Sequence, residues 1–267
     1  MISDFLQYPF IQRAFLASIM VGLLCPFVGS FVVLRRMSFF SDAISHSAFA
    51  GIAAGALLGI DLSLSSVAVA VLISLLIAFL SERTSLSHDT VIGVAFSGAI
   101  ASGMLIVGML RGFRAEVFTY LFGDILALSN TDLVMTLAVS VLAMTVLLIF
   151  MKPFLQITFN RDLASVEGVN VRLFEYLLFL IIAVVITVSL KIVGIILVTS
   201  LLIVPAASAK NIASSMMRLF VLAGLFGVAA GVLGLAGSIW LDTASGPTIV
   251  LVSIGIFFLT LFKQAKR

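Results

Sequence analysis

Charged residues are scarce in this chain. Asp, Glu, Lys and Arg together make up 10% of its 267 residues, whereas hydrophobic residues make up 62%. A soluble globular domain carries about 25% charged residues, so the composition excludes that class and leaves no room for a sizeable soluble domain. We therefore expect an all-α polytopic membrane protein, with residues 1–267 forming a single transmembrane domain.

Cysteine is almost absent as well. The single Cys25 excludes an internal disulfide and any metal site built from several thiolates. A lone cysteine in an apolar helix is most often a small packing residue, and we interpret Cys25 in that way. The chain also has no His-Glu-x-x-His motif and no second intramembrane Asp that would complete a catalytic dyad, so we expect no enzyme activity.

Long apolar runs recur from one end of the chain to the other. A hydrocarbon core of about 30 Å requires about 20 apolar residues in a helix. Nine segments of this kind can be distinguished, and an eight-span arrangement with one re-entrant segment stays open. They are residues 14–34, 41–60, 63–80, 91–110, 132–151, 174–190, 192–209, 217–238 and 246–262.

The basic residues predict the orientation of these spans. If the first span runs from outside to inside, eleven of the fifteen Lys and Arg residues fall on the inner side. The other four are Arg13, Arg111, Arg114 and Lys191. Cytoplasmic loops carry the excess of Lys and Arg, so this distribution predicts a cytoplasmic C-terminus.

The second predicted span contains an acid and an imidazole, Asp42 and His46. An ionised side chain at the centre of a bilayer costs roughly 2.5 to 3.5 kcal/mol, so such residues indicate a functional site. Residues four apart share one face of a helix, which lets both side chains contact a single divalent metal ion. The alternative is structural, with Asp42 as a helix N-cap and His46 as a core imidazole bonded to a neighbouring helix.

Two ligands from one chain are too few for a metal site. A two-fold symmetric dimer would supply both residues twice, giving two carboxylates and two imidazoles. That set satisfies tetrahedral Zn²⁺, or part of an octahedral Mn²⁺ shell, and its two negative charges balance the ion. The ligand types do not separate zinc from manganese or iron, and the general affinity order favours zinc.

Two connections between spans are too long and too polar to be simple turns. On the predicted inner side, Asn160 can cap a short helix at residues 161–167 that Gly168 can end. On the predicted outer side, residues 116–126 are amphipathic enough to lie along the membrane surface. We expect these two segments to be the surfaces on which partner proteins act, although a solvated loop is the alternative for each.

Several motifs occur together in a characteristic order. They are Leu34-Arg35-Arg36-Met37-Ser38 leading into Ser41-Asp42-Ala43-Ile44-Ser45-His46, then Asp89-Thr90-Val91-Ile92-Gly93, Tyr120-Leu121-Phe122-Gly123-Asp124-Ile125-Leu126, Asp162-Leu163-Ala164 with Glu167-Gly168-Val169, residues 193–198 and 202–207, and Asp242 with Ser245-Gly246-Pro247. In this order and spacing the chain resembles, over nearly its whole length, the membrane permease subunits of zinc and manganese ABC importers.

The resemblance implies a permease like that of the type II ABC importers, located in the cytoplasmic membrane of a bacterium or archaeon. It implies a homodimer that works with two cytoplasmic ATPase subunits and an extracytoplasmic metal-binding protein, with no nucleic acid. No cofactor is bound permanently: the metal ion, Zn or Mn, is cargo, and ATP binds the partner subunit. This chain has no Gly-x-x-x-x-Gly-Lys-Ser/Thr run that could cradle its phosphates.

The same resemblance assigns roles to residues. Asp42 and His46 match the metal site of the pore. The helix that couples to the ATPase is matched by Arg161, Asp162, Leu163, Ala164, Glu167 and Gly168. The surface that receives the metal-binding protein is matched by Glu116, Tyr120 and Asp124.

Other features bear on movement and packing. Pro205 removes one backbone hydrogen bond within the seventh span, and either a hinge or a static kink would follow. Small residues recur at helical spacings in residues 93–103 and 224–237, which predicts close helix packing on both segments. The functional alternative is a proton-coupled secondary transporter in which Asp42 and His46 relay protons without any ATPase.

Overall fold

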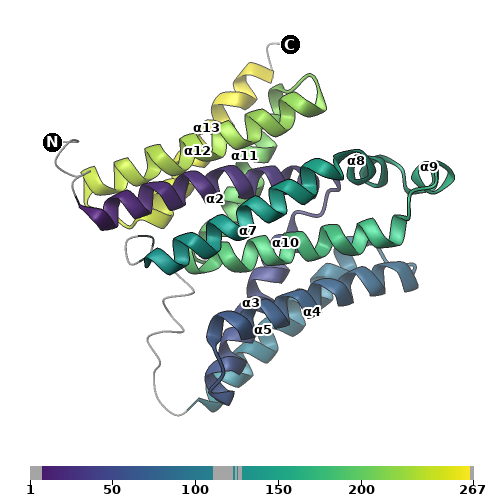
Figure 1. The fold of residues 1–267 in the computed structure, drawn as a ribbon, viewed down its shortest axis with the longest axis horizontal. Coiled ribbons are helices and arrows are strands. Elements are labelled where there is room, and N and C mark those ends of the chain that lie inside the picture. Colours follow the sequence, from purple (N-terminus) through teal and green to yellow (C-terminus); the bar gives the residue numbers. More distant parts are fainter. Residues whose placement is uncertain (1–7, 111–122, 124, 126–127, 265–267) are drawn as a thin grey trace. The chain divides into compact units, whose positions relative to one another are not determined.

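The structure is a computed structural model that describes residues 8–110, 123, 125 and 128–264 (Figure 1). These residues form helices and connecting turns, with no β-strand among them. The long helices are α2 (Pro9–Leu34), α3 (Phe39–Leu58), α4 (Leu62–Arg83), α5 (His88–Met109), α7 (Asn130–Ile149), α10 (Val171–Val193), α11 (Ile195–Ile212), α12 (Met216–Leu241) and α13 (Ser245–Gln264). Each coincides with one of the predicted spans.

Seven of the described helices are long and apolar enough to cross a membrane, namely α2, α4, α5, α7, α10, α12 and α13. A shorter apolar helix covers Leu197–Ile212, within α11. The expected all-α polytopic membrane protein is thus confirmed. Helix α3 is not among the seven, because Asp42, His46 and several serines lower its hydropathy.

Two short helices follow α7, where the sequence predicted one. Helix α9 (Arg161–Val166) confirms the expected helix, but α8 (Met151–Phe159) was not anticipated. Helix α8 begins just after α7 ends, and its Pro153 lies in the first turn, where a missing backbone N–H leaves no helical bond unmade. The connection between α7 and α10 is therefore largely helical.

The N-terminus of α5 is capped by Ser87 and not by the neighbouring Asp89. Asp89 is a natural N-cap type, but the cap is Ser87, whose Oγ accepts a hydrogen bond from the Thr90 backbone N–H at 3.2 Å. Asp89 instead lies in the first turn, where its negative charge faces the positive end of the helix dipole. Ser87 caps the helix because its extended backbone places its side chain over the helix end.

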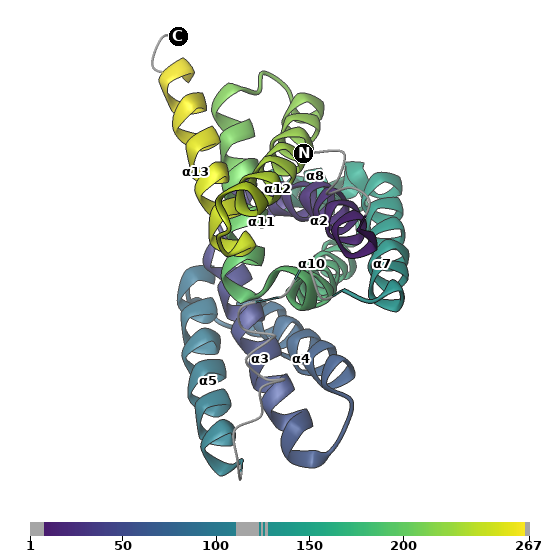
Figure 2. The same ribbon diagram turned by 90° about the vertical axis from the view of Figure 1, so that its left-hand side faces the viewer.

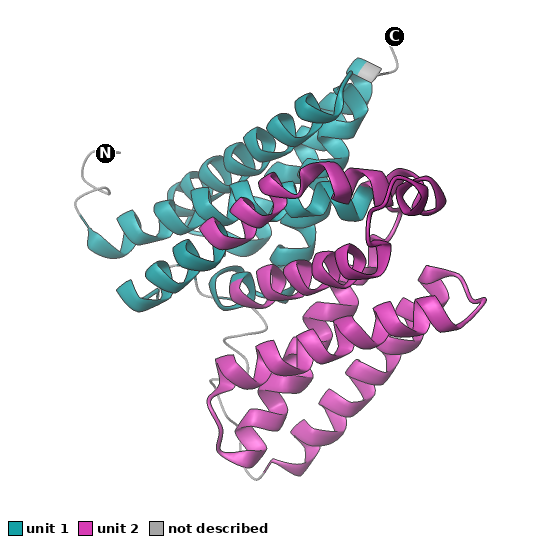
Figure 3. Cartoon of the chain, turned by 45° about the vertical axis from the view of Figure 1, so that its right-hand side comes forward, with its two compact units in different colours: residues 1–33, 119–140, 189–267 teal, residues 34–118, 141–188 magenta. Residues whose placement is uncertain are grey.

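The chain divides into two compact units (Figure 3). Unit 1 comprises residues 1–33, 119–140 and 189–267, and unit 2 comprises residues 34–118 and 141–188. In unit 1, α11, α12 and α13 pack against one another (Figure 2). Helix α2 approaches α12 so closely that a Cβ atom on Gly22 would lie 2.8 Å from the backbone oxygen of Gly227.

Unit 2 is organised around α3, which packs against both α4 and α5 (Figure 2). Ser65 of α4 donates a hydrogen bond to the backbone oxygen of Gly51 at 2.6 Å, which fixes the approach of α3 and α4. Ser74 of α4 donates to the backbone oxygen of Phe179 at 2.8 Å, which attaches α10 to the same group. Helix α3, which carries Asp42 and His46, is therefore held in the interior of its unit.

A sharp break at Gly194, in unit 1, separates the last residues of α10 from α11. Gly194 has φ 79° and ψ 166°, a conformation that residues with a Cβ atom rarely adopt. Gly123 lies so close to this break that a Cβ atom on it would overlap the backbone of Val193 and Gly194. Pro205 lies inside α11, which continues through it, and its role as a hinge stays a prediction.

The two predicted small-residue faces have different outcomes. On α12, Gly224, Gly227, Gly231 and Gly234 have close neighbours that a Cβ atom would displace, as predicted. On α5, Gly103 packs against Ala50, but Gly93, Gly98 and Gly108 face open space in the single chain. Within the chain, α5 therefore packs closely only on its Gly103 side, toward α3, and close packing at Gly93 and Gly98 stays a prediction.

Candidate functional site

Asp42 lies inside α3 and does not cap it. The helix starts at Phe39, and its N-cap is Ser38, whose side chain makes no capping hydrogen bond. Ser41 donates its hydroxyl back to the Ser38 backbone oxygen at 2.9 Å. Asp42 follows in the first turn, where the helix dipole favours a carboxylate. The structural alternative for Asp42, an N-cap, is thereby excluded.

Asp42 and His46 share one partly open side of α3. Both side chains are half-buried, whereas the intervening residues Ala43, Ile44 and Ser45 are completely buried. The imidazole of His46 lies edge-to-face against the ring of Phe96 on α5, with ring centroids 5.1 Å apart and an interplanar angle of 86°. The contact restricts the orientation of the imidazole while its residue stays partly accessible.

One chain does not supply a complete metal site. Among residues 8–110, 123, 125 and 128–264, no group of three or more His, Cys, Asp or Glu side chains could hold a metal ion. Asp42 and His46 therefore provide at most a carboxylate and an imidazole nitrogen. A divalent transition metal needs at least four ligands, so further donors must come from another molecule or from water.

The predicted coupling helix is locally well defined. The side-chain oxygen of Asn160 accepts hydrogen bonds from the backbone N–H groups of Asp162 and Leu163, at 3.0 and 3.1 Å. Glu167 is the C-cap, and Gly168 follows with φ 84°, as expected for a residue that ends a helix. Of the residues assigned to this helix, Ala164 is buried and Leu163 is 61% exposed.

Helices α8 and α9 enclose a groove of about 540 Å³. Its lining includes Leu155, Phe159, Leu163 and the side chain of Glu167, which accepts a hydrogen bond from Gln156. Phe159 is 61% exposed. Exposed apolar residues that line a concave surface are typical of a protein contact.

The residues assigned to binding-protein docking, Glu116, Tyr120 and Asp124, lie outside the described residues. Their role stays a prediction.

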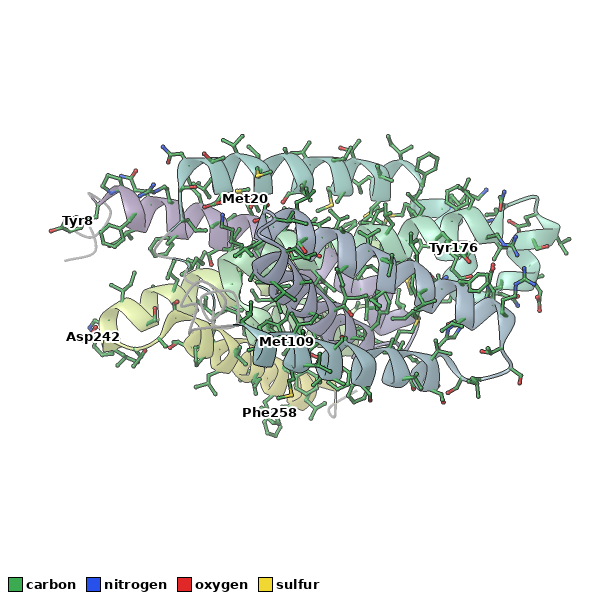
Figure 4. All side chains as sticks on the ribbon, turned by 90° about the horizontal axis from the view of Figure 1, so that it is seen from below. Tyr8, Met20, Met109, Tyr176, Asp242 and Phe258 are labelled. Atoms are coloured by element: carbon green, nitrogen blue, oxygen red, sulfur yellow. The ribbon has the colours of Figure 1, made fainter. Side chains whose placement is uncertain are left out.

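Sequence reasoning missed a buried ionic cluster in unit 2. Glu175, in the second turn of α10, is 3% exposed and accepts hydrogen bonds from both Arg35 and Arg161. Burial lowers the pKa of the Arg35 guanidinium from its ordinary value, and the negative charge of Glu175 partly offsets this. Figure 4 shows nitrogen and oxygen atoms gathered near the labelled Tyr176, which follows Glu175. The available signal was an acidic residue placed just inside an apolar span.

The fold and these residues define a class. The chain is a multi-pass all-helical membrane protein. It carries an acid and an imidazole one turn apart on an interior helix, and a capped short helix between two spans. These features are typical of a membrane transport protein. The chain belongs to the ABC 3 transport family, which matches residues 7–264.

Relatives and one solved structure agree with that assignment. The manganese transport system membrane protein MntC of Halalkalibacterium halodurans is 34% identical over 98% of this chain and 90% of its own length. The high-affinity zinc uptake system membrane protein ZnuB of Haemophilus influenzae is 34% identical over 95% of this chain and 97% of its own. A structure of PsaBC from Streptococcus pneumoniae in complex with Fab has a TM-score of 0.86 at 33% identity, covering 98% of this chain and 96% of that one.

Proposed function

We propose that this chain is the permease subunit of an ATP-driven ABC importer that carries a divalent transition-metal ion across the cytoplasmic membrane. The observation that carries the proposal is the placement of Asp42 and His46, one turn apart and half-buried on an interior helix. Membership of the ABC 3 transport family and the names of the manganese and zinc relatives support it. The family also favours ATP-driven transport over a proton relay through the same two residues.

The metal site would be completed by a second copy of the chain. One protomer offers a carboxylate and an imidazole on the same side of α3, and a two-fold axis beside that helix would duplicate them. Two carboxylates neutralise a divalent ion, which would otherwise be very costly in a low-dielectric channel. On α5, which packs against α3, Gly93 and Gly98 leave the backbone exposed without a side chain, as a close contact between two copies requires.

The α8–α9 groove would receive the ATPase subunit. The predicted arrangement has four spans between α9 and the C-terminus. An even number of spans puts both on the same side of the membrane, so a cytoplasmic C-terminus places α9 in the cytoplasm too. Arg161 and Arg172 on this connection agree with that side. Leu163 and Val166, 61% and 84% exposed, would then enter a pocket on the ATPase.

The cargo is expected to be zinc. The two-carboxylate, two-imidazole set suits tetrahedral Zn²⁺ with ligand distances of about 2.0 to 2.2 Å, and zinc binds such ligands more tightly than manganese or iron. Manganese would need extra oxygen ligands from water or the backbone. Carboxylate and imidazole ligands bind zinc, manganese and iron, so an uptake experiment has to compare the three ions directly.

Metal uptake by cells tests the proposal. A strain lacking this chain is complemented with the wild type or a variant, and accumulation of zinc, manganese and iron is measured at limiting external metal. We expect Asp42→Ala and His46→Ala each to abolish uptake while membrane insertion and dimer assembly persist. Robust uptake by both variants would refute the assignment.

A matched variant controls for general damage. Asp61→Asn changes an acid at the N-cap of α4, where Asn caps equally well, so uptake should be retained. Loss of uptake in this control as severe as in Asp42→Ala would remove the special role of the pair.

A further inference from the structure

Glu175 joins three segments that lie far apart in the sequence. Its Oε1 accepts a hydrogen bond from Nη1 of Arg35 at 3.4 Å, and its Oε2 accepts one from Nη2 of Arg161. Glu175 belongs to α10, Arg161 to α9, and Arg35 to the short connection between α2 and α3. All three residues belong to unit 2.

Arg35 also attaches a fourth segment to this cluster. Its Nε donates a hydrogen bond to Oγ1 of Thr158, near the C-terminus of α8, at 3.4 Å. The side chain of Arg35 is only 8% exposed, so it is held between Glu175 and Thr158 rather than extended into water. The helices α8 and α9 are thereby linked to the residues that immediately precede α3.

A second contact connects the same face of α10 to the start of α3. Phe179 lies one turn beyond Glu175, and residues four apart share a helix face. Its ring packs edge-to-face on the ring of Phe40, with centroids 4.7 Å apart, and both side chains are completely buried. Phe40 comes two residues before Asp42. One face of α10 therefore contacts Arg161 of α9 at one point and the Asp42 end of α3 one turn away.

The chemistry of the cluster makes this link stiff. A buried carboxylate shared by two guanidiniums is held firmly, because separating the groups leaves the charge of Glu175 buried without its counterions. Charge-assisted hydrogen bonds of this kind also fix direction as well as distance. A displacement of α9 would therefore move α10 and the beginning of α3 with it.

We propose that Glu175 is a positioning residue that couples α9 to the Asp42 end of α3, through Arg35 on one side and Phe179 and Phe40 on the other. The inference rests on the proposed function, in which the ATPase docks on α9 and the metal binds at Asp42 and His46. It assigns to Glu175 the step between the two sites: movement of α9 during the ATPase cycle repositions Asp42.

The experiment uses the complex of this chain with its ATPase subunits, purified by a tag on the permease and reconstituted into vesicles with the binding protein. Metal transported, ATP hydrolysed and metal bound at equilibrium are measured on each sample. The informative quantity is the amount of metal transported per ATP. Co-purification of the ATPase is measured separately, because it reports docking on α9.

Arg35→Gln is the main variant, since it leaves the Glu175–Arg161 pair intact and does not alter α9. We expect metal transported per ATP to fall about 5- to 150-fold, the range of typical coupling between sites, while metal binding and ATPase co-purification persist. Glu175→Gln should have the same effect. Arg35→Lys, which keeps a positive partner for Glu175, should retain most of the coupling.

Glu82→Gln is the matched control. Glu82 of α4 pairs with Arg172, whose side chain is 69% exposed, and accepts a hydrogen bond from Tyr176; both partners belong to α10, so neither contact involves α9 or α3. Its loss should leave the transport ratio unchanged. The single variants could misfold, because each leaves one buried charge without its partner. The double variant Arg35→Leu with Glu175→Leu tests the link without that problem, because it removes both charges of the pair. It should assemble and be uncoupled.

Three outcomes would overturn the proposal. The first is that Arg35→Gln and Glu175→Gln transport as much metal per ATP as the wild type. The second is that the assembled double variant does so. The third is that Glu82→Gln loses as much metal transport per ATP as these variants do. Failure of the proposed function can be told apart from failure of this inference, because in the first case the wild-type complex itself would transport no metal. An uncoupled Glu175→Gln in a complex whose wild type transports metal supports the inference.

Discussion

The imidazole of His46 stands perpendicular to the ring of Phe96, with the two centroids 5.1 Å apart. The contact joins α3 to α5 beside Asp42, so α5 sets the direction in which one proposed ligand points. It also gives α5 a part in the site that its apolar sequence does not reveal.

Replacing this ring should weaken metal binding. An aromatic pair contributes about 0.5 to 1.5 kcal/mol, so Phe96→Leu should lower metal affinity about 2- to 10-fold through a less well oriented imidazole. Equilibrium metal binding to the purified permease measures the change. Phe79→Leu on α4, where the ring is 46% exposed, is the control and should bind as the wild type does. Equal affinity in the two variants would contradict the role of Phe96.

The N-cap of α9 should govern the local stability of that helix. Asn160 satisfies two backbone N–H groups, and loss of an N-cap costs about 0.5 to 2 kcal/mol. Asn160→Ala should therefore accelerate hydrogen exchange at the amides of Asp162 and Leu163 and reduce co-purification of the ATPase. Asn160→Asp keeps a capping oxygen and should preserve both. The same exchange rates in the two variants would show that capping does not stabilise α9.

Two glycines of α12 should respond oppositely to the same substitution. A Cβ atom at Gly227 would overlap the backbone oxygen of Gly22 and the ring of Pro26, and overpacking costs about 1 to 3 kcal/mol. Gly227→Ala should lower the melting temperature of the detergent-purified protein by about 2 to 12 °C. At Gly237 the nearest atom, in Thr248, would lie 3.7 Å away, an ordinary contact. Gly237→Ala should melt at the wild-type temperature or above; a similar drop in both would exclude close packing as the cause.

The positions of the spans and the presence of α9 were predictable because their causes are local. Apolar runs of sufficient length become helices in a bilayer, where every backbone group needs an internal partner. Asn160 and Gly168 mark the ends of α9 by capping chemistry that involves only neighbouring residues. Helix α8 was missed because its mixed sequence follows directly on an apolar span and lacks a visible break.

The candidate site was predictable only in part. The four-residue spacing of Asp42 and His46 indicates one helix face without any knowledge of the fold. Phe96 could not be assigned, since nothing in a uniformly apolar helix shows which side meets its neighbour. Glu175 was visible as an acid inside a span, but its partners Arg35 and Arg161 were not.

The sequence by itself determined the class of protein, the approximate positions of the long helices and the spacing of Asp42 and His46 on one helix face, because hydropathy, capping and helical spacing act over a few residues. The tertiary structure decided that Arg35 meets Glu175 across 140 residues, that α12 rather than α5 packs its glycines tightly within the chain, and that Asp42 lies inside a helix rather than at its cap. These outcomes depend on which helix faces come together. Between apolar helices, shape and a few polar contacts make that choice, and neither appears in a hydropathy pattern.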